Sequence, residues 1–260
     1  MKQFIYIMSY KINKMVAIMI ACISLIVSGS TGSPVVIGGK DIDTQNYPYQ
    51  LALLVNNKYT CGATIIGREY ALTAAQCVKG VSESKITLRA GSNKADSGGY
   101  VYTVSKVVVH ENYDQAKNLN DISLLKVSTP FGLTKPGVKT VGLPLLNEAI
   151  PTEKDAYLTG YGKTSASGIA TNILHGTKFP TISDNVCKKS VPSLTGTMGC
   201  AGYTSGGRDA CEGDQGSPLV FNKKLIGITS WNFSCGLKPS PIVFTKVSNY
   251  RDWIKKNSGI

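Results

Sequence analysis

The 260-residue sequence has only two histidines, His110 and His175, and no Cys-x-x-Cys pair. Both histidines also lie far from any pair of cysteines, so a zinc site is not indicated, and we expect neither a metal nor another cofactor. Charged residues make up only 17% of the chain, whereas glycine is frequent. This composition is typical of an all-β protein with many turns rather than a helical or disordered one. The length suffices for one large double unit or for two small domains.

Acidic residues are few: 16 Asp and Glu stand against 28 Lys and Arg, a formal net charge of +12. A basic surface can attract acidic partners. The lysines are scattered, however, and neighbouring pairs occur only as Lys188-Lys189, Lys223-Lys224 and Lys255-Lys256. Because there is no basic-aromatic motif and no recognition helix, we do not expect binding to nucleic acid.

Long apolar runs are absent beyond the first 30 residues. Lys2, Lys11 and Lys14 precede an apolar run, Met15–Val27, that small residues follow. This order is typical of a secretory signal peptide. The run has 13 residues, whereas a helix needs about 20 to cross a bilayer. We therefore expect residues 1–29 to be a signal peptide, residues 30–35 to be a short extension, and the protein to be exported and not bound to a membrane.

Six cysteines follow the signal peptide, an even number that suits disulfides in an oxidising compartment. Sequence alone does not choose among their possible pairings. Short apolar or alternating runs separated by turn residues predict antiparallel strands in two series, on either side of a connector near residues 132–151. The predicted strands are Gln50–Val55, Ala63–Ile66, Lys85–Ala90, Val101–His110, Ile122–Val127, Ala156–Tyr161, Thr171–Phe179, Ser217–Phe221, Lys224–Ser230 and Pro241–Lys246.

Three motifs carry a resemblance to a known family. Residues 213–218 read Gly-Asp-Gln-Gly-Ser-Pro, residues 72–77 read Leu-Thr-Ala-Ala-Gln-Cys, and residues 120–125 read Asn-Asp-Ile-Ser-Leu-Leu. They resemble the nucleophile, histidine and aspartate segments of the trypsin/chymotrypsin family, and the resemblance extends over residues 36–260.

The resemblance implies a chymotrypsin-like fold of two six-stranded antiparallel β-barrels with a C-terminal helix. We expect barrel 1 at about 36–145, barrel 2 at about 146–246 and the helix at about 247–257. It also implies three disulfides: Cys61–Cys77, Cys187–Cys200 and Cys211–Cys235.

The resemblance places Gln76, Asp121 and Gln215 at the three positions of the catalytic triad. A carboxamide is neither a general base near neutral pH nor an ionisable nucleophile. Loss of either reacting group in such a triad lowers turnover by a factor on the order of 10⁶. The sequence therefore predicts that the chain is not an enzyme and that only a remnant oxyanion hole, at Gly213 and Gln215, persists.

Other family positions also differ. Asp209 matches the specificity carboxylate, but Asn232 and Ile242 replace glycines of the pocket wall and are expected to close the pocket. Asp214 matches the residue that pairs with a freed α-amino group, here that of Val36, although no Lys or Arg directly precedes Val36. Asn232 also begins an Asn-Phe-Ser sequon, a possible glycosylation site.

Together with the absence of a Cys-rich clip module, these differences make the chain similar to the inactivated serine protease paralogues of parasitic mites. It is most similar to those of the scabies mite, which are related to the mite group 3 allergens. This resemblance implies a secreted monomer of the mite gut that binds host proteins, namely complement components, and inhibits complement. The alternative is a non-catalytic cofactor or decoy in an arthropod protease or immune cascade.

Overall fold

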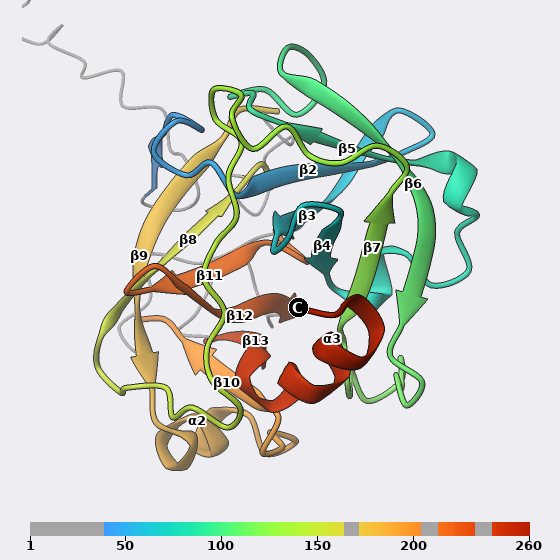
Figure 1. Cartoon of the computed structure of the whole chain (residues 1–260). Coiled ribbons are helices and arrows are strands. Elements are labelled where there is room, and N and C mark those ends of the chain that lie inside the picture. Colours follow the sequence, from blue (N-terminus) through green and yellow to red (C-terminus); the bar gives the residue numbers. More distant parts are fainter. Residues whose placement is uncertain (1–38, 164–171, 204–212, 232–240) are drawn as a thin grey trace, which may run out of the picture. The chain divides into compact units, whose positions relative to one another are not determined.

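The computed structural model describes residues 39–163, 172–203, 213–231 and 241–260, which are mostly strands (Figure 1). The strands are β1 Lys40–Asp41, β2 Gln50–Val55, β3 Lys58–Ile65, β4 Tyr70–Thr73, β5 Ile86–Ala90, β6 Tyr100–Val109, β7 Ser123–Val127, β8 Asp155–Gly160, β9 His175–Ile182, β10 Met198–Ala201, β11 Pro218–Phe221, β12 Lys224–Trp231 and β13 Ile242–Lys246. The helices are η1 Ala75–Cys77, η2 Glu83–Lys85, α2 Asp184–Ser190, η3 Val247–Tyr250 and α3 Arg251–Ser258.

The first six-stranded unit is a closed barrel in the order β2-β3-β4-β7-β6-β5. Strand β5 shows how the sequence builds it: Ile86, Leu88 and Ala90 are buried, whereas Thr87 and Arg89 are partly exposed. Successive side chains of a strand point to opposite faces, so this alternation directs one face of β5 into the barrel.

The second unit follows the order β9-β10-β13-β12-β11-β8, and a further pairing of β8 with β9 closes the ring. The short strand β1 adds to β9 from outside this ring. The predicted pair of six-stranded antiparallel barrels with a C-terminal helix is confirmed.

Two-residue turns close the hairpins β2–β3 and β11–β12. Asn56 and Asn57 have φ of 52° and 62°, and Asn222 and Lys223 have φ of 46° and 61°. Positive φ at both central residues matches the right-handed twist of the flanking strands, and asparagine adopts this conformation more readily than most residues. Lys223 is therefore held in a conformation that lysine rarely adopts, at the tip of its hairpin.

Sequence patterns missed β4, β10 and α2. The two strands have four residues each, too few to show a period. Helix α2 begins after Ser183, whose Oγ accepts a hydrogen bond from Val186 N at 3.4 Å. Serine directly before a helix is a start signal, so this residue was the available clue.

Two of the three expected disulfides lie within the described residues. Cys61–Cys77 and Cys187–Cys200 are bonded, which confirms two of the three predicted bridges. Cys211, Cys235 and the whole predicted signal peptide and extension lie outside the described residues. In the described part of the chain, no helix is long and apolar enough to span a membrane.

Candidate functional site at the junction of the two barrels

Gln76 lies in η1, directly after β4, between the buried residues Ala75 and Cys77. The residue itself is exposed, but its amide is anchored: Nε2 donates to Asp121 Oδ2 at 2.5 Å and to the carbonyl of Ser230 at 2.8 Å. One amide hydrogen is thus donated to Asp121 of the first barrel and the other to Ser230 of the second. The side chain of Gln76 therefore links η1 of the first barrel to β12 of the second.

Asp121, directly before β7, is fully buried. Its Oδ1 accepts from Gln76 N at 2.9 Å, and its Oδ2 accepts from Ser230 Oγ at 2.5 Å in addition to Gln76 Nε2. Burial raises the pKa of the Asp121 carboxyl, and the hydrogen bonds from Ser230 and Gln76 act in the opposite direction. Its carbonyl accepts from Thr245 Oγ1 at 2.9 Å, so Asp121 is held from both barrels.

Gln215 lies in the loop before β11, and its side chain folds back on that loop. Oε1 accepts from Gly213 N at 2.9 Å, while the Gln215 carbonyl accepts from Gly62 N of β3 at 2.8 Å. The other side of the Gly213 peptide is also held, because Tyr59 OH donates to its carbonyl at 2.5 Å. The amide of Gly213, predicted as an oxyanion-hole donor, is therefore bonded to the chain's own Gln215.

The shape of this loop depends on two glycines. Gly213 and Gly216 have φ of 96° and 77°, a region that residues with a Cβ rarely adopt. A Cβ on Gly216 would also collide with Thr73 and with the carbonyl of Gly62. The Gly-Asp-Gln-Gly spacing therefore fixes the backbone that presents Gln215.

Asp214, next in the loop, is also buried. Its Oδ1 accepts from Gly162 N at 3.1 Å. The expected partner in the family, the amino group of Val36, lies outside the described residues, so this pairing stays a prediction.

The predicted pocket is only partly within the described residues. Ile242 begins β13, is 2% exposed, and belongs to the same apolar cluster as Ala201 and Phe244. Asp209 and Asn232 lie outside the described residues. The closed pocket and the glycosylation of Asn232 therefore stay predictions.

Sequence patterns did not identify Tyr59, Ser230 and Thr245 as parts of the site. Ser230 lies two positions before Asn232, which the resemblance had placed in the pocket wall, and this proximity was the available signal. The Tyr59–Gly213 bond joins residues 154 positions apart, and no local pattern predicts such a contact.

The two histidines take other roles. His110 packs against the rings of Tyr250 and Trp253, at centroid distances of 5.3 and 5.2 Å. His175 is buried on β9, its Nδ1 lies 3.0 Å from Asp41 Oδ1, and burial lowers its pKa. Within the described ranges, no group of three His, Cys, Asp or Glu residues could hold a metal ion.

Comparison with known proteins places this site in a family. A family model described as Trypsin matches residues 36–254. The chain is 36% identical to a trypsin of Sus scrofa over 85% of this chain and 94% of that protein. It is 33% identical to a trypsin of Phaedon cochleariae over 86% of this chain and 89% of that protein. It is also 34% identical to a vitellin-degrading protease of Bombyx mori over 85% of each.

These comparisons correct one prediction from the sequence. The chain was expected not to be an enzyme, because glutamine occupies two positions of the triad. The proteins that it matches over most of their length are named as trypsins and as a protease. The prediction that the chain is not an enzyme is therefore wrong.

Proposed function

The chain belongs to the trypsin family, and we propose that it is exported and binds another protein with the surface around Gln76 and Gln215. The observation that carries the proposal is the anchoring of both carboxamides. Gln76 is hydrogen-bonded to Asp121 and Ser230, and Gln215 to Gly213. Groups that are fixed before binding lose little conformational freedom on binding, which favours affinity.

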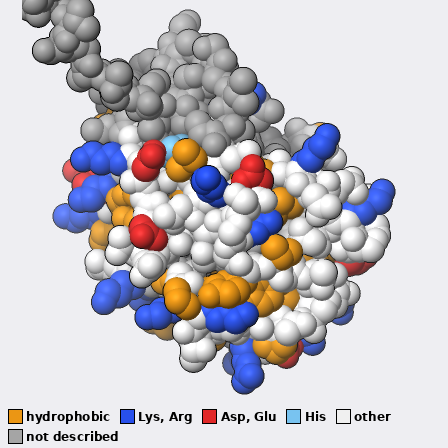
Figure 2. All heavy atoms as spheres, turned by 90° about the horizontal axis from the view of Figure 1, so that it is seen from above, with side chains coloured by type: hydrophobic (Ala, Val, Ile, Leu, Met, Phe, Trp, Pro, Cys, Tyr) orange, Lys and Arg blue, Asp and Glu red, His pale blue; other side chains and the backbone are white. Residues whose placement is uncertain are grey.

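The partner proposed is a component of host complement. The resemblance to serine protease paralogues of parasitic mites supports this choice, as does the basic charge of the chain, which can attract acidic partners. On the face seen in Figure 2, lysine and arginine side chains are spread among neutral and hydrophobic ones. Such a surface suits a protein partner better than a polyanion that needs a continuous basic track.

Family membership favours a second candidate, cleavage of a protein at the junction of the barrels. The buried Asp121 and the loop that presents Gln215 lie where this chemistry would take place. The binding proposal holds with or without cleavage, so the two candidates are tested side by side.

The experiment measures binding of purified complement components to the immobilised chain, together with complement haemolysis at micromolar dose. Gln76→Ala and Gln215→Ala should each weaken binding by about tenfold, equivalent to about 1.4 kcal/mol. Gln115→Ala is the matched control, because Gln115 is exposed and lies outside the site. Binding that neither site variant changes would refute the proposed surface, and no binding at all would refute the partner.

The second candidate is tested with fluorogenic peptides that carry Lys or Arg before the scissile bond. Turnover that Asp121→Asn reduces and Asp155→Asn leaves unchanged would establish cleavage at this site. Asp155 is a suitable control because its side chain is 54% exposed.

A further inference from the structure

Two adjoining cavities open on the second barrel, beside the segment that connects the barrels. The larger, about 420 Å³, lies between this connector, the start of α2, and the strands β10 and β13. The smaller, about 230 Å³, lies between the connector and the β11–β12 hairpin. Both are lined by Glu148, Ala149, Ile150 and Ser248. We call the two cavities together the connector groove.

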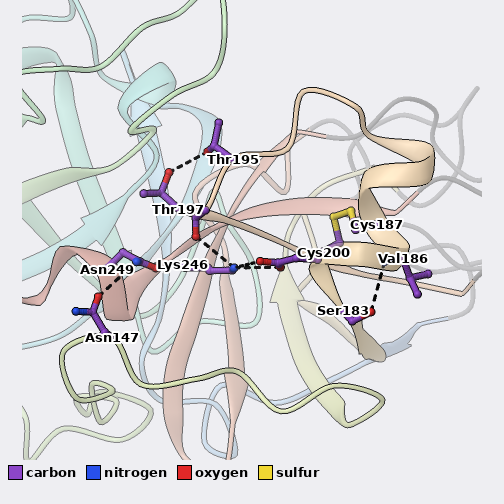
Figure 3. A network of polar contacts seen from close by, with 11 residues as sticks. Asn147, Ser183, Val186, Cys187, Thr195, Thr197, Cys200, Lys246 and Asn249 are labelled. Atoms are coloured by element: carbon purple, nitrogen blue, oxygen red, sulfur yellow. Dashed lines mark hydrogen bonds and ion pairs between the residues drawn. A yellow bond between two sulfur atoms is a disulfide. The ribbon is translucent and has the colours of Figure 1, made fainter.

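One wall of the larger cavity is polar, and Figure 3 shows the polar contacts of Lys246, Asn147 and Asn249, which belong to it. Lys246 Nζ donates to Asp184 Oδ2 at 2.8 Å and to Oδ1 at 3.0 Å, so the two charges of this pair neutralise each other. Asn249 and Asn147 line the same cavity and join through a long contact of 3.5 Å. Carboxamides offer both donors and acceptors, which is what the backbone of an extended peptide requires.

The smaller cavity has an apolar wall. Its apolar lining includes Pro144, Ile150, Phe221 and Ile226. Leu145 and Leu146 follow Pro144 in the chain and are 73% and 48% exposed. An apolar hollow beside exposed leucines is suited to an apolar side chain of a partner, because contact would remove both surfaces from water.

The charges around the groove favour an acidic partner. The carboxylates in its wall already form ion pairs. Glu148 Oε1 lies 2.7 Å from Lys224 Nζ, and Asp184 Oδ2 lies 2.8 Å from Lys246 Nζ. In contrast, Lys223 at the hairpin tip and Lys188 and Lys189 at the end of α2 are exposed. The elements that bound the groove therefore carry exposed lysines for which the described residues provide no salt bridge.

We propose that the connector groove binds an extended acidic segment of a partner protein. An apolar side chain of that segment enters the smaller cavity, its backbone bonds to the asparagines of the larger one, and its carboxylates face Lys223, Lys188 and Lys189. A sulfated polysaccharide would have no use for the apolar cavity, so the groove favours a peptide. The groove is lined by none of the residues that form the candidate site among the described residues, and the inference does not depend on the proposed function.

The probe is a fluorescein-labelled peptide of glutamates around one phenylalanine, titrated by fluorescence anisotropy. Ala149 is exposed and lines both cavities, so Ala149→Trp should fill them and weaken binding by at least about tenfold. Ala116→Trp is the matched control, because Ala116 is also exposed, and it should bind as the unchanged chain does. Replacing phenylalanine by serine in the peptide should weaken binding by a similar factor.

Charge is tested separately. Lys223→Glu with Lys188→Glu should weaken binding and reduce its salt dependence, whereas Lys106→Glu in the first barrel should change both less. A peptide with glutamine for glutamate should bind weakly at every salt concentration.

Three results would overturn the proposal: no peptide binding up to about 1 mM, equal binding by Ala149→Trp, or a heparin fragment that binds instead and is unaffected by that variant. Gln76→Ala and Gln215→Ala should leave peptide binding unchanged. A lack of peptide binding at the connector groove would therefore not contradict the proposed function. A lack of complement binding at the barrel junction would likewise not contradict the proposal for the groove.

Discussion

Most buried apolar side chains of the first barrel belong to one large cluster, which also takes in Val220, Leu225 and Ile228 of the second barrel. Most of the other buried apolar side chains described in the second barrel form two smaller clusters. The large cluster includes Leu51 and Val141 and continues into α3 with Trp253 and Ile254. In the second barrel, one cluster contains Phe244 and the other surrounds the Cys187–Cys200 disulfide. The connector groove opens on this second barrel.

This difference has a physical consequence. A continuous cluster packs at the density of an organic crystal and leaves little room. A divided interior depends more on single large side chains, crosslinks and polar bonds, and it can border cavities. We therefore expect the stability of the second barrel to be concentrated in fewer residues.

The largest effect is expected at Phe244. Its ring is 1% exposed and occupies space that Gly199 and Gly227 leave free, since a Cβ on either glycine would collide with the ring. Phe244→Ala should lower the free energy of unfolding by about 4 kcal/mol, measured by chemical denaturation. Leu88→Ala in the first barrel removes a smaller side chain from the large cluster and should lower the free energy of unfolding by about 3 kcal/mol. A larger loss at Leu88 would contradict the comparison.

Removing each disulfide tests the same contrast. The two cysteines are 13 residues apart in Cys187–Cys200 and 16 residues apart in Cys61–Cys77. Chain entropy alone therefore predicts that removing either disulfide lowers the free energy of unfolding by nearly the same amount, about 3 kcal/mol. The Cys187–Cys200 disulfide lies within a small apolar cluster. Replacing both of its cysteines by serine should therefore lower the free energy of unfolding more than the same change at Cys61–Cys77. If both variants unfold at the same midpoint concentration of denaturant, the division of the apolar interior into clusters has no effect on stability.

Asp121 tests the polar contacts between the barrels. Asp121→Asn places an NH₂ group against donors from Ser230 and Gln76, although it also removes a charge that burial disfavours. The substitution should lower the free energy of unfolding by about 2 kcal/mol, measured by thermal unfolding at neutral pH. Asp155→Asn, at an exposed side chain, should change stability little.

The smallest effect is expected at His175. Burial lowers its pKa below the ordinary value of 6.5, so the unfolded chain takes up a proton at a pH where the folded histidine is still neutral. Its contribution to stability is present above the unfolded pKa and is lost as pH falls from about 6.5 toward the folded pKa. His175→Gln should therefore flatten the fall in melting temperature between about pH 7 and 5. An unchanged slope would show that pairing with Asp41 offsets burial.

Sequence patterns predicted much of the fold because its strands alternate and its turns contain asparagine and glycine. Strand β2 begins and ends at its predicted residues, 50 and 55. Short elements such as β4 and β10 had no such signal. At the site, the positions of Gln76, Asp121 and Gln215 were identified from motifs, but their bonding was not. A carboxamide can donate or accept in several directions, and only the surrounding atoms select one.

The prediction that the chain is not an enzyme illustrates the limit of arguing from two substituted positions. It followed from the chemistry of glutamine alone, and the trypsin relatives contradict it. What the substituted residues do in the folded chain had to come from their contacts.

The sequence by itself determined antiparallel strands in two series, and the resemblance to the trypsin/chymotrypsin family then implied the two barrels and the two disulfides that the structure contains. These features depend on alternation, motif spacing and local backbone conformation. The tertiary structure alone decided that Gln76 binds Ser230 of the other barrel, that Gln215 occupies the amide of Gly213, and that a groove forms beside the connector. The first contact joins residues 154 positions apart, and the groove is the space that folded segments leave unfilled. Neither is encoded in any local stretch of the chain.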